Sequence, residues 1–141
     1  MNTITIKIAL AQNQTNLNLL IIYWQDKNIK AVLAFCRDTE FIIRIDELNC
    51  GKLRYLCWHK SKSIFNLPCL ILRDGTIEKS ASGDKLEFVF TNKDSLYVME
   101  YLLPNTEDGR PQFFLEITDY RNKKSTWKME EIPLPKYLLN L

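Results

Sequence analysis

The sequence has 141 residues, of which 46% are hydrophobic and 26% are charged, and its formal net charge is +2. This size and composition are typical of one folded domain and argue against long disordered or low-complexity segments. A net charge this close to zero provides no bulk attraction to nucleic acid or to membrane surfaces.

The N-terminal residues do not resemble a secretory signal, because Lys7 and the neighbouring threonines interrupt any apolar stretch. The longest nearly apolar run, residues 17–24, is far shorter than the roughly 20 residues of a membrane helix. We therefore expect a soluble, cytoplasmic protein that forms a single domain over residues 1–141. In that compartment the four cysteines are expected to be reduced thiols rather than disulfides.

The first third of the chain contains several candidate strands. Isoleucines alternate with polar residues over 3–10, which is the period of a half-buried strand. Residues 19–25 and 40–46 are rich in β-branched and aromatic side chains, which also favours strands. Residues 28–36 fit both a helical spacing and a strand alternation, and the strands on either side of them favour a strand.

The segment 46–60 is the best candidate for a helix. Asp46 can cap a helix, and Leu48, Leu53 and Leu56 could share a helical stripe. Gly51 opposes this assignment because glycine destabilises a helix interior by about 1 kcal/mol. A strand over 52–60 fits the same residues equally well, so helix and strand both remain open.

From residue 69 onward, short apolar runs alternate with turn signals. Asp74 and Gly75 lie between the runs 69–73 and 76–79, and this dipeptide predicts a hairpin with a type I′ turn. Further breaker-rich or polar segments separate four more predicted strands, at 85–91, 95–103, 112–119 and 125–132.

This succession of strands predicts a mainly β protein. We expect an antiparallel meander that is closed as a barrel or folded as a sandwich, since a sheet of many short strands must hide its edges. A helix over 46–60 would add one α element, and an α+β fold is the alternative.

The inventory of reactive side chains gives little support to catalysis. His59 is the one histidine in the sequence, and Cys57 lies two residues before it, flanked at a distance by Cys50 and Cys69. A cysteine nucleophile, Cys50 or Cys57, with His59 as its base is the least supported hypothesis. A zinc site from these four residues lacks the usual Cys-x2-Cys pair, and no glycine-rich phosphate loop occurs. We therefore expect no cofactor and no metal, and we lean away from an enzyme.

Glu100 interrupts an otherwise apolar face that includes Leu96, Val98 and Leu102. A buried Glu100 would need a partner such as Arg44 or Arg54 and would then be a candidate site residue. We favour the opposite arrangement, in which the core side of this strand carries Tyr97, Met99, Tyr101 and Leu103.

Two stretches, 52–62 and 120–128, interleave aromatic and basic side chains. On a β platform such a pattern can hold single-stranded nucleic acid by base stacking and phosphate neutralisation. Lysines at hairpin tips also serve simply to keep a sheet soluble, and tryptophans are more often core residues. The candidate nucleic-acid face comprises Arg54, Trp58, Lys60, Arg121, Lys123 and Lys124.

The C-terminal tail, residues 133–141, is unusually apolar for a chain end, and such a surface is normally covered. We favour packing of the tail against its own domain, with docking on a partner as the alternative. The side chains concerned are Leu134, Tyr137, Leu138, Leu139 and Leu141.

Together these patterns favour a non-catalytic binding module, such as a protein-interaction, accessory or inhibitor subunit with a protein partner or a second copy of itself. One alternative is a β-barrel that binds a small apolar ligand inside. Another is binding of single-stranded nucleic acid through the two basic aromatic stretches. No association with a membrane is expected.

Overall fold

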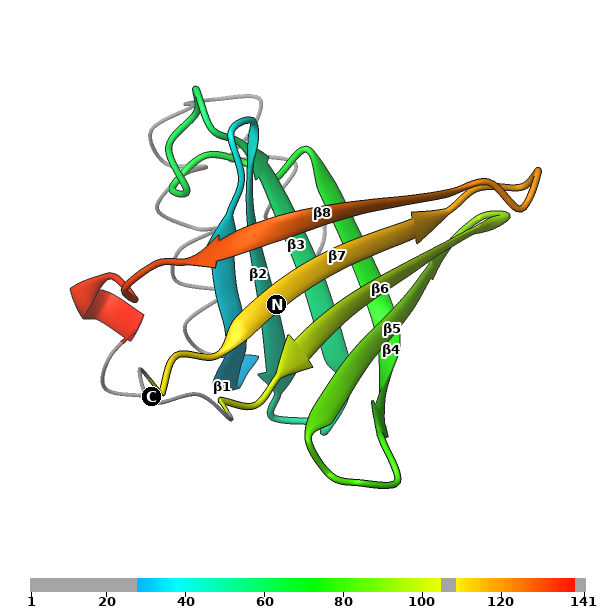
Figure 1. The fold of residues 1–141 in the computed structure, drawn as a ribbon. Coiled ribbons are helices and arrows are strands. Elements are labelled where there is room, and N and C mark those ends of the chain that lie inside the picture. Colours follow the sequence, from blue (N-terminus) through cyan, green and yellow to red (C-terminus); the bar gives the residue numbers. More distant parts are fainter. Residues whose placement is uncertain (1–27, 105–108, 139–141) are drawn as a thin grey trace.

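The computed structural model describes residues 28–104 and 109–138, which fold into an antiparallel β-barrel (Figure 1). The strands are neighbours in chain order, and the last one returns to the first. They are β1 (Ile29–Arg37), β2 (Phe41–Leu48), β3 (Leu53–His59), β4 (Leu70–Lys79), β5 (Lys85–Asn92), β6 (Ser95–Leu102), β7 (Gln112–Thr118) and β8 (Lys124–Glu131), followed by the 3-10 helix η1 (Lys136–Leu138). The predicted mainly β, antiparallel meander is confirmed, and it closes as a barrel.

The ambiguous segment 28–36 is a strand, β1, and the predicted strand at 40–46 is β2. The strands predicted over 3–10 and 19–25 lie outside the described residues. Within the part of the chain that is described, no helix has the length and apolar character needed to cross a membrane.

The helix considered for 46–60 is wrong, and with it the α+β alternative. Strand β2 runs on to Leu48, Gly51 takes a φ of 88° in the following turn, and β3 begins at Leu53. The leucine spacing mimicked a helix because β3 is buried on both faces over Leu53–Trp58, so apolar residues do not alternate with polar ones.

The hairpin predicted at Asp74-Gly75 is also wrong, because residues 70–79 form the single strand β4. In its pairing with β3, Leu53 lies opposite Gly75 while Arg54 lies opposite Arg73. Asp74, with a φ of 58°, is therefore the extra residue of a β-bulge. The positive φ that suggested a turn instead bends β4, so that its first part pairs with β3 and its last part, 76–79, pairs with β5.

The remaining strands follow the predicted order, and their alternation decides which side chains enter the core. Met99 is buried and Tyr97 and Tyr101 pack against the core, whereas the Glu100 side chain is 23% exposed and pairs with Lys85 at 3.5 Å. The favoured orientation of β6 is thus confirmed, although Leu103, beyond the strand end, is 39% exposed. The core comprises Ala34, Cys36, Ile43, Ile45, Leu53, Tyr55, Cys57, Leu72, Phe88, Phe90, Met99, Phe113, Leu115 and Met129.

Candidate binding site

The barrel is closed by a short seam between β8 and β1. Strand β8 pairs with β7 continuously from Lys124 to Met129, but it pairs with β1 only through Arg37–Glu130 and Cys36–Glu131. Because β1 ends at Arg37, the first six residues of β8 run past it, as the projecting β7–β8 hairpin in Figure 1 illustrates. This end of the barrel is therefore open beside β8.

A cavity of about 290 Å³ lies at this opening. Its walls are mainly inward-facing side chains of the core and its margin, so it enters the barrel itself rather than resting on the surface. The lining residues are Asp38, Thr39, Glu40, Phe41, Ile43, Tyr55, Cys57, Cys69, Leu70, Tyr97, Leu115, Ile117 and Trp127.

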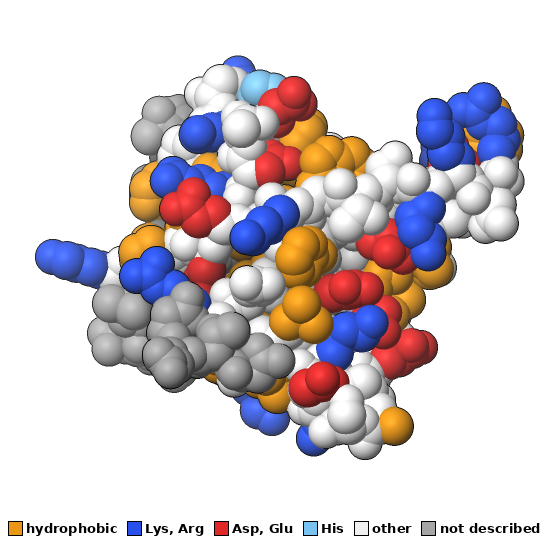
Figure 2. All heavy atoms as spheres, in the orientation of Figure 1, with side chains coloured by type: hydrophobic (Ala, Val, Ile, Leu, Met, Phe, Trp, Pro, Cys, Tyr) orange, Lys and Arg blue, Asp and Glu red, His pale blue; other side chains and the backbone are white. Residues whose placement is uncertain are grey.

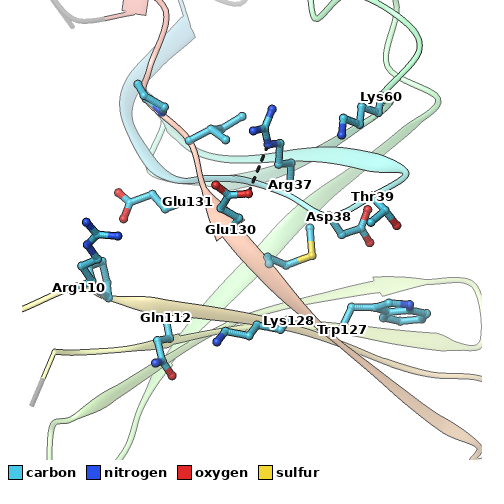
Figure 3. Close-up of a pocket in the computed structure, with 14 residues that line it drawn as sticks. Arg37, Asp38, Thr39, Lys60, Arg110, Gln112, Trp127, Lys128, Glu130 and Glu131 are labelled. Carbon is cyan, nitrogen blue, oxygen red and sulfur yellow. Dashed lines mark ion pairs between the residues drawn. The ribbon is translucent and has the colours of Figure 1, made fainter. Parts of the chain in front are cut away.

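A larger groove of about 1020 Å³ runs along the outside of the seam (Figure 3). One wall is formed by Arg37 to Thr39 and Lys60. The other is formed by β8 and the residues after it, together with residues 110–112 at the start of β7. Asp38, Thr39 and Trp127 line both the groove and the cavity. Trp127, which is 40% exposed, therefore stands at the boundary between the barrel interior and the outer surface.

The inner part of the cavity carries no charge at neutral pH. Burial raises the pKa of the Tyr55 hydroxyl well above its usual range, and the neighbouring Cys57 and Tyr97 add to the shift. Burial also raises the pKa of the Cys57 thiol, with a further contribution from Cys69. The Cys69 Sγ donates a hydrogen bond to the Cys57 carbonyl oxygen at 3.2 Å. Both inner polar groups thus remain protonated and neutral.

Aromatic contacts hold the cavity walls in place. The Tyr55 ring lies 5.6 Å from Phe90 and 5.7 Å from Tyr97, between ring centroids, and the Tyr97 contact is edge-to-face. At the entrance, Phe41 and His59 make a similar edge contact at 5.4 Å. Such contacts add about 0.5–1.5 kcal/mol each to the burial of the rings and restrict the orientation of these side chains.

The rim is shaped by the turn between β1 and β2. Asp38 Oδ1 accepts hydrogen bonds from the backbone N–H groups of Glu40 and Phe41, at 2.8 and 2.7 Å. Across the seam, Arg37 lies 3.7 Å from Glu130. These interactions fix the edge of the opening and give it charges of both signs.

The structure separates Cys50 from the other cysteines and the histidine with which the sequence grouped it. Cys57 and Cys69 line the same cavity, whereas Cys50 lies in the turn between β2 and β3, at the far end of that hairpin. The His59 Nδ1 contacts the Ser61 hydroxyl at 2.8 Å. Among the described residues, no three metal-binding side chains come together.

The residues of the candidate nucleic-acid face do not share one surface. Arg54 and Trp58 are 0% and 1% exposed, and the Trp58 Nε1 donates to the Asn66 carbonyl oxygen at 2.9 Å. Lys60 is exposed just after β3. Figure 2 shows a separate group of basic side chains at the tip of the β7–β8 hairpin, where Arg121, Lys123 and Lys124 lie.

The described residues of the C-terminal tail are buried to differing degrees. Leu138 in η1 is 2% exposed, and Leu134 is half-buried. Leu139, Leu141 and the side chain of Tyr137 lie outside what is described. Docking of the tail on a partner remains a prediction.

Several residues at the opening were not singled out from the sequence, notably Thr39, Cys69 as a cavity residue, and Ile117. Alternation assigns the two faces of each predicted strand. What it could not provide was the position of the opening, which depends on where β1 ends relative to β8.

Comparison with protein families finds no family model that matches this chain, and neither curated proteins nor solved structures give a match. The site must therefore be interpreted from its own geometry.

Proposed function

We propose that the protein is a binding module that holds a small, uncharged, mainly apolar molecule in the mouth of its barrel. The observation that carries this proposal is the cavity of about 290 Å³ whose walls continue into the core. An eight-stranded barrel is just wide enough either to be filled by side chains or to hold one small ligand. Mostly apolar clefts with a few polar groups are the usual form of such sites.

The size and chemistry of the cavity limit the ligand. An apolar cavity of about 150 Å³ holds a benzene molecule, so this cavity suits a molecule of roughly two fused rings. Its inner end must be uncharged, because Tyr55 and Cys57 are buried and neutral and a buried charge without a partner is costly. Its outer end would lie beside Trp127 and the polar rim.

The test uses 2-naphthol as a probe, with binding measured by isothermal titration calorimetry. Ile117→Phe, at a half-buried position in the cavity wall, should fill the mouth and weaken binding by about tenfold or more. Leu96→Phe is the matched control, because Leu96 is 40% exposed on the outer face of β6. No binding by the unmodified protein, or equal binding by Ile117→Phe, would contradict the proposal.

A further inference from the structure

The edge of β8 that faces away from β7 has free backbone groups that begin in the groove at Lys128 and continue beyond it toward Lys124. The Ile132 N–H donates to the Phe35 carbonyl oxygen at 3.0 Å, so the polar backbone groups of Ile132 point toward β1. Along an antiparallel strand these groups alternate between the two sides, and the pairing of β8 with β7 contains no register shift. The N–H and C=O groups of Lys124, Thr126 and Lys128 therefore point to the same side as those of Ile132.

No described strand pairs with that side of β8 before Glu130. The side chains of Thr126, Trp127 and Lys128 are all exposed, so the edge is accessible. An accessible strand edge of this kind is a template for another extended chain.

We infer that this edge binds an extended peptide segment of a partner protein by strand addition, with acidic residues facing outward and apolar residues facing inward. Strand addition obtains affinity from backbone hydrogen bonds and specificity from alternate side chains. The inference does not depend on the proposed small-molecule site, although the two share Trp127.

The charges around the groove specify the outward positions of the peptide. Lys60 on one wall and Lys128 on the other are exposed, and neither lies within ion-pair distance of a described acidic side chain. In contrast, Arg37 faces Glu130 and Lys124 lies 3.3 Å from Glu116. Figure 3 shows Lys60 and Lys128 on opposite sides of the groove. Carboxylates at separate positions of the peptide could therefore pair with Lys128 on one wall and with Lys60 on the other.

Trp127 specifies the residues of the peptide that face inward, because it lies on the same face of β8 as the core residue Met129. A peptide residue opposite Trp127 would point toward the barrel mouth and contact its indole ring. Cross-strand pairs of aromatic and β-branched side chains stabilise a sheet by about 0.2–1 kcal/mol each. The partner segment should therefore alternate acidic and β-branched residues.

The probe is a fluorescein-labelled seven-residue peptide of alternating glutamate and valine, and binding is followed by fluorescence anisotropy. Thr126→Pro removes a donor from the free edge without removing a hydrogen bond to β7, and proline is tolerated at such an edge. We expect this variant to weaken binding by about three- to tenfold, because the peptide loses the backbone hydrogen bond to the Thr126 N–H group. Thr126→Val, which keeps the N–H group, is the matched control and should bind as the unmodified protein does.

A charge exchange keeps the inference testable should Thr126→Pro fail to fold. Lys128→Glu should bind the glutamate peptide more weakly and a lysine–valine peptide more strongly than the unmodified protein does. The inference would be overturned if a peptide of the same composition, with its glutamates and valines in two separate blocks, bound as tightly as the alternating peptide. Unchanged binding of the alternating peptide by a folded Thr126→Pro variant would overturn it as well. Sedimentation velocity gives a further outcome: a dimer that dissociates on Thr126→Pro would assign the edge to a second copy and also overturn it.

The experiment separates this inference from the proposed small-molecule site. Thr126→Pro changes the outer edge of β8 and should leave 2-naphthol binding intact, whereas Ile117→Phe changes the cavity wall and leaves the free backbone groups of β8 in place. Each binding activity can therefore fail without the other.

Discussion

Asp46 occupies an unusual position, on the outer face of β2 yet completely buried. Its carboxylate accepts hydrogen bonds from Arg44 at 2.8 and 3.0 Å and from Arg54 at 3.2 and 2.7 Å. The Arg44 guanidinium also lies 5.5 Å from the centre of the Trp58 ring. Burial lowers the pKa of Arg54, and the charge and hydrogen bonds of Asp46 oppose that shift. Asp46 thus stabilises the buried guanidinium groups of both Arg44 and Arg54.

We predict that Asp46→Ala lowers the free energy of unfolding by about 3–5 kcal/mol, because it leaves buried guanidinium groups without this carboxylate. Urea unfolding followed by circular dichroism measures the change. Asp94→Ala, in the exposed turn after β5, is the control and should change stability by about 0.5 kcal/mol or less. A loss no larger than that of the control would show that the cluster contributes little to stability.

At the scale of a single element, β4 shows how one strand serves two parts of the barrel. Its bulge at Asp74 lets the chain bend between β3 and β5. The next residue, Gly75, lies against the ring of Phe90, so that a Cβ atom at residue 75 would overlap the ring at Phe90 Cε1. Close approach of β4 to β5 therefore requires the absence of a side chain at residue 75.

Gly75→Ala should destabilise the fold by about 1–3 kcal/mol, since the Phe90 ring is only 2% exposed and cannot move into solvent freely. The neighbouring Thr76→Ala is the control, because Thr76 is exposed. Adding Phe90→Leu to Gly75→Ala should recover part of the loss by making room for the new methyl group. Thermal unfolding of the three variants tests this, and an unchanged midpoint for Gly75→Ala would contradict the assigned contact.

The elements also show what local sequence signals can and cannot provide. Strands β5 to β8 were predicted near their observed limits because each has a polar face and is bounded by turn residues. The errors at 46–60 and at Asp74-Gly75 have different local causes. A strand buried on both faces loses its alternation, as β3 does, and a positive φ is required in a bulge as well as in a turn, as at Asp74. Neighbouring strands decide between these cases.

At the scale of the whole molecule, two cysteine thiols and one tyrosine hydroxyl are buried in their protonated, neutral form. Burial raises the pKa of Cys36 to about 12, with smaller contributions from Asp38 and Glu131. Burial also raises the pKa of Tyr55 and of Cys57. In the unfolded chain a cysteine loses its proton near about pH 8.5 and a tyrosine near about pH 10. Above these values the native state holds more protons than the unfolded state does.

The stabilisation that these groups provide should therefore be complete below about pH 8, and the free energy of unfolding should fall as the pH rises above this value. Once a buried group ionises in the unfolded chain, it lowers the free energy of unfolding by up to about 1.4 kcal/mol per pH unit. Urea unfolding between pH 7 and about pH 11 measures this slope. Cys36→Ala should show a shallower decline than the unmodified protein, and a stability that stays constant up to about pH 11 would contradict the burial of neutral thiols.

Within the candidate site, sequence patterns found the orientation of residues but not their assembly. Tyr97 was correctly placed on the core side of its strand. Arg54 and Trp58 had been grouped with exposed lysines because they share a stretch of sequence with Lys60, yet they are buried. Alternation assigns two faces to a strand, and it does not say whether the outer face is covered.

The sequence by itself determined the class of fold, because a period of two in hydrophobicity is a local property that survives in almost any antiparallel arrangement. Tertiary structure alone decided where the barrel opens. That position depends on two strands far apart in the chain, β1 ending at Arg37 and β8 beginning at Lys124, and on their joining at only two residue pairs. The cavity and the free edge arise from this difference in length and register, which no single stretch of residues encodes.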